Sequence, residues 1–315
     1  MARSDAMSVL AQAADDYLRL RRRLGHDLAE AHRLLPRFVE YLDETKTSTV
    51  TIASALAWAF EGGIDPASSV GSRRMTIVRG FARHLSAIDP LTEIPPHGLV
   101  PSRQRWRPPF IYTPTDIAGL LAQAATIHFP FVAATYETLF GLLAATGIRV
   151  GEARHLDHGD IDWADAVLSI RESKFGKSRL VPVTPCTLAA LDRYTQLRDK
   201  TRPPTHIPAF FVSLRGNRLV YPSVHEIFRR LCTDAGIGVG SATIPRIHDL
   251  RHTFVVRTLL DWYRAGENVE VRLPALSTYL GHRDPRSTYW YLSAAPELLA
   301  LAAGRLELSN GVISR

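Results

Sequence analysis

A proline-rich stretch divides the 315-residue chain. Seven prolines lie between residues 90 and 114, at positions 90, 95, 96, 101, 108, 109 and 114. Proline lacks a backbone N–H and has a restricted φ, so this stretch is a poor helix and a good extended linker. The sequence therefore predicts two domains, residues 1–89 and 113–315, joined by a linker over residues 90–112.

The first domain is predicted to be helical. Apolar residues recur at roughly helical spacing from Leu10 to Leu42, without the alternation of β-branched residues that marks strands. Residues 72–86 are predicted to form an amphipathic helix whose basic side carries Arg73, Arg79 and Arg83. That side is interpreted either as a solvated surface or as a contact for phosphate groups.

The second domain is predicted to combine helices with a small antiparallel sheet, which makes the chain mainly α. Two short strands, 166–171 and 180–183, flank a turn, and the apolar run near 210–213 predicts a third strand. Helices are predicted over 113–155 with a break at Thr146–Gly147, over 223–235, over 248–263, in a segment begun by Pro274, and over 296–306.

The charge balance favours a polyanionic partner. Lys and Arg number 38 against 31 Asp and Glu, a formal net charge of +7. Each cation placed near a nucleic-acid phosphate releases condensed counterions, which favours binding. A generally basic surface is the alternative interpretation of the same excess.

Cysteine usage and hydropathy indicate where such a chain resides. Cys186 and Cys232 are far apart in the sequence and make no disulfide scaffold, so both are interpreted as small core residues of a protein in a reducing cytosol. No apolar run approaches the ~20 residues that span a bilayer. We expect a cytoplasmic protein, associated with the nucleoid when it acts, and no membrane partner.

Four segments of the second domain carry strongly basic or nucleophilic side chains. They are ATGIR with Arg149, SKFGKSRLVPV with Lys174, Lys177 and Arg179, HDLRH with His248 and Arg251, and LGH with His282, nine residues before Tyr291. Arginine forks bind phosphate oxygens in pairs, and histidine supplies donors or a proton acceptor near neutral pH. Lysine can protonate a departing oxygen, and tyrosine becomes a nucleophile where positive charge stabilises its phenolate. Together these residue types suit phosphodiester transfer without a metal.

These motifs resemble the catalytic boxes of the tyrosine recombinases, or phage-integrase family. The motifs A-T-G-I-R, K-x-x-K-x-R-x-V-P, H-x-L-R-H and L-G-H followed nine residues later by Tyr occur in the family's order over about residues 110–305. The helical N-terminal ninety residues are similar to the family's core-binding domain. The resemblance implies a clamp on double-stranded DNA with specific recombination sites, a homo- or hetero-tetramer with related recombinases, and no cofactor or ATP.

Carried over residue by residue, the resemblance implies a phosphate clamp. Arg149 and Arg251 would hold the scissile phosphate. His248 and His282 would contact the same phosphate or assist proton transfer. Glu152 stands where the family often has a carboxylate that orients the site. Metal ligands are not implied.

The nucleophile and the general acid are implied in the same way. Tyr291 matches the residue that forms a 3′-phosphotyrosine and frees a 5′ hydroxyl, and Lys174 matches the general acid for the 5′ oxygen. Two neighbours compete for these roles, Tyr289 and Lys177. The spacing from the L-G-H motif favours Tyr291, and the first lysine of the hairpin is favoured over the second. Arg179 is interpreted as a DNA-backbone contact or a salt bridge.

Further DNA contacts are expected outside the catalytic boxes. The linker arginines and the hairpin are the candidates, namely Arg103, Arg105, Arg107 and Lys177. The apolar segment 298–306 is expected to dock either on a neighbouring subunit, as in relatives, or on its own core.

The same residues allow other interpretations. His248 and His252 have the i,i+4 spacing of a zinc helix, but Arg251 between them would repel a cation and no third ligand stands out. His155, His158 and His252 are interpreted as structural or surface histidines. A type IB topoisomerase-like enzyme would use the same phosphotyrosine chemistry without strand exchange, and a non-catalytic DNA-binding accessory protein would form no covalent complex. The target sequence, and whether the role is integration, transposition or resolution, stay open.

Overall fold

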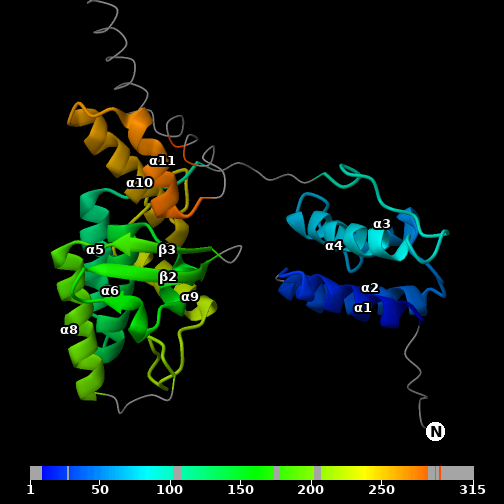
Figure 1. The fold of residues 1–315 in the computed structure, drawn as a ribbon, viewed down its shortest axis with the longest axis horizontal. Coiled ribbons are helices and arrows are strands. Elements are labelled where there is room, and N and C mark those ends of the chain that lie inside the picture. The colour runs from blue at the N-terminus through cyan, green and yellow to red at the C-terminus, as the bar shows by residue number, and fades with distance from the viewer. Residues whose placement is uncertain are drawn as a thin grey trace, which may run out of the picture. The chain divides into compact units, whose positions relative to one another are not determined.

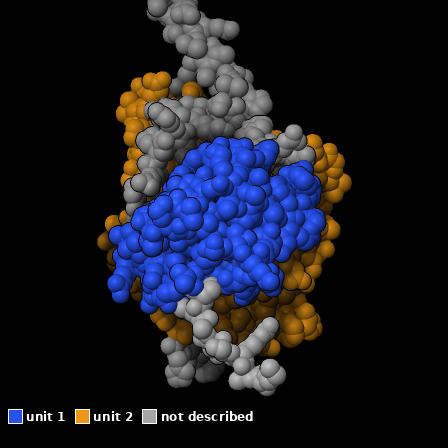
Figure 2. All heavy atoms as spheres, turned by 90° about the vertical axis from the view of Figure 1, so that its right-hand side faces the viewer, with its two compact units in different colours: residues 1–106 blue, residues 107–315 orange. Residues whose placement is uncertain are grey.

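The computed structural model describes residues 9–26, 28–101, 108–173, 177–201 and 207–282, together with Thr288 and Tyr291, and gives the backbone alone for residues 172, 173 and 177. The chain divides into two compact units, residues 1–106 and 107–315, which are coloured separately in Figure 2. Among the helices described, none combines the length and the apolar character that crossing a membrane requires.

The described part of the first unit consists of helices (Figure 1). Their bounds are α1 Val9–Arg23, α2 Ala29–Glu44, α3 Ile52–Phe60 and α4 Ser69–Leu85. Phe38 and Leu42 from α2, Trp58 from α3 and Phe81 from α4 are at most 1% exposed and form one apolar cluster. The helical prediction for this part of the chain is confirmed, because the 3.6-residue period of apolar residues places one face of each helix in a common core.

The beginning of the predicted linker packs against the first unit. Arg79 donates from Nε to the Pro95 carbonyl at 2.7 Å and from Nη2 to the Pro96 carbonyl at 2.9 Å, and Val100 is buried in the helical core. Arg79 is 8% exposed, so its placement on a solvent-facing basic side is wrong. Buried backbone carbonyl groups need hydrogen-bond donors, and a proline-rich segment has few backbone N–H groups to offer. The Arg79 side chain supplies these donors.

The second unit combines helices with a three-stranded antiparallel sheet in the order β1-β2-β3. The helices are α5 Pro114–Ala125, α6 Pro130–Thr146, α7 Val150–His155, the 3₁₀ turn η1 His158–Asp160, α8 Pro185–Thr201, α9 Tyr221–Asp234, α10 Ile247–Arg264 and α11 Val269–Leu280. The strands are β1 Ile161–Asp162, β2 Val167–Ser173 and β3 Lys177–Pro182, and Leu168 pairs with Val181. The predicted fold class, mainly α with a small antiparallel sheet, is confirmed.

Two apolar clusters stabilise the second unit. The larger one gathers α5, α6, α8 and α9 around aromatic side chains such as Phe140, Tyr194 and Phe228, each at most 1% exposed. The smaller one lies between α10 and α11, which are neighbours in Figure 1, and includes the buried ring of Tyr291. The second cluster therefore joins the last described residue to the helix that carries the HDLRH motif.

One predicted element of the second unit is wrong, and one helix is missing from the prediction. The third strand is Ile161–Asp162 instead of 210–213, where Val212 forms an isolated bridge with Arg218 and takes no place in the sheet. Phe210 and Phe211 are fully buried against Tyr194, so this apolar run reflects core packing. The helix α8 was not anticipated.

The start of α11 and the environment of one cysteine also differ from expectation. The helix begins at Val269 behind the cap residue Asn268, whose side chain accepts from the backbone of Val271, so Pro274 lies inside it. Cys232 is buried as expected, whereas Cys186, at the beginning of α8, is exposed.

Candidate active site

Two helices end on glycines in the left-handed conformation, and both ends belong to the candidate site. Gly147 ends α6 with φ 62°, and Gly281 ends α11 with φ 66°. The last carbonyl groups of a helix lack partners within it and carry partial negative charge, so they attract cations. These two ends receive the arginines of the predicted phosphate clamp.

Arg251 joins the two helix ends. From α10, its Nη1 donates to the Gly147 carbonyl at 2.7 Å and its Nη2 donates to the Leu280 carbonyl at 2.6 Å. The side chain is 2% exposed, and this burial lowers its pKa to about 10, which leaves it cationic at neutral pH. A charged fork is thereby fixed in place by backbone acceptors from two separate motifs.

Arg149 reaches the same end of α11. It caps α7, its Nη1 donates to Glu152 Oε1 at 2.8 Å, and its Nη2 lies 3.3 Å from the Gly281 carbonyl. The backbone N–H of Arg149 also donates to Glu152 Oε2 at 2.8 Å. The two arginines separated by a hundred residues of sequence thus end on consecutive carbonyl groups of α11.

Glu152 is the buried anion of the site. Its side chain is 5% exposed and accepts from Arg179 Nη1 at 3.0 Å and Nη2 at 2.9 Å. Burial alone would raise the pKa of this carboxyl group, but the hydrogen bonds and charges of Arg179 and Arg149 outweigh it, and the net pKa is lowered. The carboxylate stays charged and holds Arg149 in position.

Arg179 is engaged inside the protein. Its side chain is 9% exposed, and besides the ion pair with Glu152 its Nε donates to the Tyr279 carbonyl at 2.7 Å. Of the two expectations for Arg179, the structure shows the salt bridge. Through this residue β3 is attached both to the carboxylate of the clamp and to the last turn of α11.

The hydroxyl group of Tyr291 lies within this cluster. Tyr291 is 3% exposed, and its Oη is 2.9 Å from His252 Nδ1. Burial raises the pKa of the phenol, while the charge of Arg251 and a hydrogen bond from it act in the opposite direction. The structure therefore brings the predicted nucleophile to the predicted phosphate clamp.

The two predicted catalytic histidines border the same space. His282 Nδ1 is 2.8 Å from Thr288 Oγ1, and the rings of His282 and Tyr291 are parallel with centroids 6.4 Å apart. Burial, followed by the charges of Arg251 and Arg149, lowers the pKa of His282 to about 4. His248 lies on α10 one turn before His252, and the pKa of its ring is also lowered by desolvation and by Arg251.

His252 lies closer to the predicted nucleophile than the sequence indicates. Its four-residue spacing from His248 places both side chains on one face of a helix, but no sequence motif links that face to Tyr291. The structure places a ring nitrogen of His252 against the nucleophile. His155 and His158 have other contacts, since His155 Nδ1 is paired with the Gly151 carbonyl and His158 lies against Arg198.

The remaining site residues are only partly described. Lys174, Arg103, Arg105 and Arg107 lie outside the described residues, as do Tyr289 and the segment 298–306. For Lys177 the structure gives a place at the first position of β3.

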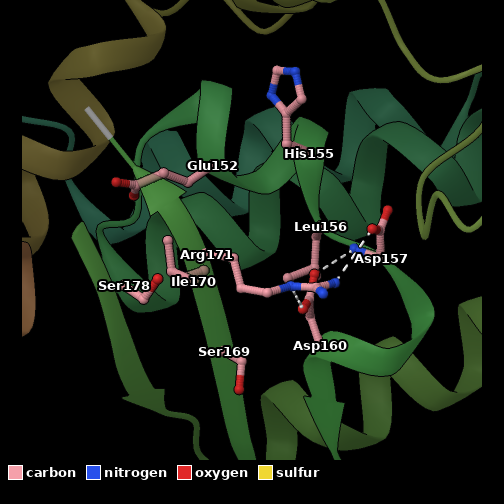
Figure 3. Close-up of a pocket in the computed structure, with 9 residues that line it drawn as sticks. All are labelled: Glu152, His155, Leu156, Asp157, Asp160, Ser169, Ile170, Arg171 and Ser178. Carbon is pink, nitrogen blue, oxygen red and sulfur yellow. Dashed lines mark hydrogen bonds and ion pairs between the residues drawn. The ribbon is translucent and has the colours of Figure 1, made fainter. Parts of the chain in front are cut away.

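A cavity of about 490 Å³ opens beside Glu152 (Figure 3). Arg171 from β2 extends across it, pairing with Asp160 and, at 3.3 Å, with Asp157. Arg218 also pairs with Asp157. Arg171 is thus matched by two carboxylates, so this cavity is poorly suited to a phosphate group.

Substitution of Gly147 should destabilise the second unit at the point where the Gly147 carbonyl binds Arg251. A Cβ atom there would lie 2.6 Å from Phe254 Cδ1, and the residue's φ of 62° is unfavourable for alanine. We expect Gly147→Ala to destabilise the second unit by about 2–4 kcal/mol and to lower its Tm by roughly 5–10 °C. Gly151→Ala is the matched control, because nothing lies within 4 Å of a Cβ there. Thermal unfolding measures both, and equal Tm values would contradict the prediction.

The histidines should make stability depend on pH. Burial and neighbouring positive charges lower the pKa of His252 to about 3 and that of His282 to about 4, from 6.5. Between those values and 6.5 the unfolded chain binds more protons than the folded one, so the free energy of unfolding falls as the pH drops below about 6.5. After allowance for solvent screening we expect a loss of about 1–2 kcal/mol between pH 7 and pH 4.5. Urea unfolding at several pH values measures this for the wild type and for His282→Asn. The free energy of unfolding of the variant should change less with pH. A free energy of unfolding that is constant or rises toward pH 4.5 would contradict the lowered histidine pKa values.

Known proteins resemble this chain in sequence. Residues 113–297 match the model of the phage integrase family. The chain is 41% identical to the putative integrase/recombinase y4rB of Sinorhizobium fredii, over 96% of this chain and 98% of the relative, and 36% identical to y4rE of the same organism, over 96% and 97%.

Solved structures share the fold. The integrase of the Tn1549 transposon in complex with transposon right end DNA aligns with a TM-score of 0.64 and 18% identity, covering 94% of this chain and 98% of that one. A lambda integrase dimer bound to a COC′ core site aligns with a TM-score of 0.57 and 17% identity, covering 90% and 94%. The family model and the full-length relatives show that the chain belongs to the phage integrase family, the tyrosine recombinases.

Proposed function

We propose that the protein is a site-specific DNA recombinase that cuts and rejoins DNA through a covalent 3′-phosphotyrosyl intermediate. The observation that carries this proposal is the convergence of three segments: Arg149 and Arg251 end on consecutive carbonyl groups of α11, and the Tyr291 hydroxyl group lies beside Arg251. Full-length similarity to a putative integrase/recombinase, and the fold shared with a transposon integrase bound to DNA, support a role on a mobile element.

The clamp arginines would stabilise charge that develops on the phosphate. A phosphodiester gains negative charge on its non-bridging oxygens as the phosphorus atom becomes five-coordinate. Arg149 and Arg251 are held by backbone and carboxylate acceptors before DNA binds, so little reorganisation is needed when that charge develops. His248 and His282, neutral at pH 7, would add hydrogen-bond donors.

Tyr291 would attack and Lys174 would protonate the departing 5′ oxygen. The Tyr291 hydroxyl group is buried beside a guanidinium, which favours the phenolate as the O–P bond forms. The new bond conserves the energy of the broken one, so the free 5′ hydroxyl of another strand can reverse the reaction without ATP.

An arginine cleft on the first unit supports DNA binding there. Arg33 and Arg37 from α2 and Arg73 and Arg74 from α4 line a cavity of about 240 Å³ with one acidic residue, Glu30. Glu30 lies 3.4 Å from Arg73 in a largely exposed ion pair, which water and salt weaken. The excess of positive charge in one small hollow suits a backbone phosphate.

The arginine cleft should account for part of the DNA affinity. We expect the double variant Arg33→Ala/Arg37→Ala to bind duplex DNA about 10- to 100-fold more weakly at 100 mM salt and to lower the slope of log K against log salt by about 1.8, since two phosphate contacts are lost. Arg19→Ala is the control, because Arg19 pairs with Asp16 on α1. Fluorescence anisotropy at several salt concentrations measures both, and an unchanged slope in the double variant would rule the cleft out.

The function itself is tested by strand exchange. Purified protein is mixed with two DNA duplexes that carry the ends of the element encoding it, and with supercoiled plasmid that lacks them. A recombinase produces reciprocal exchange between the paired sites, by the proposal within a tetramer. Relaxation of the plasmid without exchange would indicate topoisomerase-like activity, and DNA binding without any covalent complex would indicate an accessory protein. The protein would act at the nucleoid, where its substrate is.

A further inference from the structure

The least expected contact in the site is that between His252 and the nucleophile. His252 Nδ1 lies 2.9 Å from Tyr291 Oη, within hydrogen-bond distance, and the two rings are 5.3 Å apart between centroids. The His252 ring also meets the ring of His248 edge to face at 4.8 Å. The His252 ring is therefore packed between His248 and the nucleophile.

We infer that His252 is a catalytic residue that accepts the phenolic proton when Tyr291 attacks the phosphate, and returns it when the strand is rejoined. The inference rests on the proposed function, because it names a proton acceptor for that reaction. His252 lies outside the set of catalytic residues that the family resemblance implies.

The ionisation of His252 in the free protein suits an acceptor. Burial, followed by the electrostatic effects of His248, Arg246, Arg251 and His282, lowers its pKa to about 3. The imidazole is therefore neutral at pH 7, with one ring nitrogen able to accept a hydrogen bond. The proposed role requires the tautomer with its ring proton on Nε2, in which Nδ1 accepts from the phenol.

Binding of DNA would make His252 more basic. A phosphodiester placed against Arg149 and Arg251 brings a negative charge that offsets the positive charges depressing the pKa of the imidazole. Proton transfer then becomes easier in the presence of the substrate than in its absence. Free protein would keep its tyrosine protonated and unreactive.

Cleavage forms one bond to phosphorus, breaks another and transfers two protons. The electron pair of the Tyr291 O–H bond forms the new Oη–P bond, and the proton passes to His252 Nδ1, which becomes cationic. The P–O5′ bond breaks with its electron pair on oxygen, and that oxygen takes a proton from the proposed general acid, Lys174. In the reverse step a 5′ hydroxyl group attacks the phosphorus and gives its proton to the neutral Lys174, the Oη–P bond breaks with its electron pair on Oη, and His252 returns its proton to Tyr291.

The neighbouring imidazoles are placed differently. His282 Nδ1 is 2.8 Å from the Thr288 hydroxyl group, and its ring is stacked parallel to that of Tyr291 with 6.4 Å between centroids. His282 Nδ1 is thus engaged with Thr288, whereas His252 Nδ1 lies against the Tyr291 hydroxyl group. His252 has the better geometry for direct proton transfer.

The test is the rate of covalent complex formation at saturating protein on a nicked duplex bearing the cleavage site mapped with wild-type protein. Asparagine places an amide near the position of Nδ1 but cannot take up a proton. We expect His252→Asn to react about 10²- to 10⁴-fold more slowly than the wild type, with DNA affinity within about threefold. The pH–rate profile should also lose its low-pH inflection. His225→Asn, at a histidine of α9 that lies beside Tyr221, is the matched control and should react at the wild-type rate.

A second measurement separates a base from a structural residue. A 5′-bridging phosphorothiolate has a leaving group that needs no general acid, so it should rescue Lys174→Ala and leave His252→Asn slow. Added imidazole should partly restore His252→Ala, by at least about tenfold. A His252→Asn rate within threefold of the wild type, or its rescue by the phosphorothiolate, overturns the inference alone. If wild-type protein forms no covalent complex on any substrate, the proposed function fails and the inference fails with it.

Discussion

Tyr291→Phe is expected to abolish covalent capture of nicked DNA, by at least about 10⁴-fold, while DNA affinity stays within about twofold of the wild type. The substitution removes the attacking oxygen atom and leaves the ring, which packs between α10 and α11 with the apolar residues of the smaller cluster. The lost hydrogen bond to His252 should cost about 1 kcal/mol of stability. Denaturing gels that separate the protein–DNA adduct measure the capture.

Tyr289→Phe is the matched control for this experiment. It removes the same atom from the tyrosine that competes for the role in the sequence, and we expect it to react at a rate within threefold of the wild type. If Tyr289→Phe abolished capture and Tyr291→Phe did not, the nucleophile would be the other tyrosine.

Arg251→Lys should be almost as damaging as removal of the side chain. Lysine keeps the charge but has one nitrogen, so it cannot donate to the Gly147 and Leu280 carbonyls in the same fork and also face the phosphate. We expect a decrease of at least about 10³-fold in the rate of covalent complex formation and a loss of about 2–4 kcal/mol in stability.

Arg257→Lys, one and a half turns further along α10, controls for the chemistry of the substitution. It should leave both the rate and the unfolding free energy close to those of the wild type. Single-turnover rates at saturating DNA and urea unfolding measure the two effects separately. Full activity of Arg251→Lys would mean that positive charge suffices and that the fork geometry has no role in the clamp.

The site residues that could be predicted from the sequence are those that belong to short motifs. Arg149, Arg251, His282 and Tyr291 stand at distinctive spacings, and the structure brings them together because their motifs occupy helix starts and helix ends. The helices and the β2–β3 hairpin could also be predicted. Apolar residues recur with a different period in helices than in strands, and a turn separates the two strands. None of this required knowledge of contacts distant in sequence.

The errors arose where tertiary packing overrides a local pattern. Phe210 and Phe211 satisfy a strand pattern, but their burial against α8 serves the core. Arg79 satisfies the pattern of a solvent-facing residue, yet proline carbonyls sixteen and seventeen residues further on draw it inward. His252 was not assigned to the site because its partner, Tyr291, is 39 residues away and no local sequence pattern indicates that contact.

The last turn of α11 supports three arginines of the candidate active site. Its consecutive carbonyl groups at Leu280 and Gly281 fix Arg251 and Arg149, and Tyr279 fixes Arg179. A substitution that frays this one turn would remove one anchor from each of three guanidinium groups at once, leaving them held by Gly147 or Glu152. Inactivating mutations in natural copies should therefore concentrate there as well as at the residues that perform the chemistry, and a screen that scores only substrate contacts would miss them.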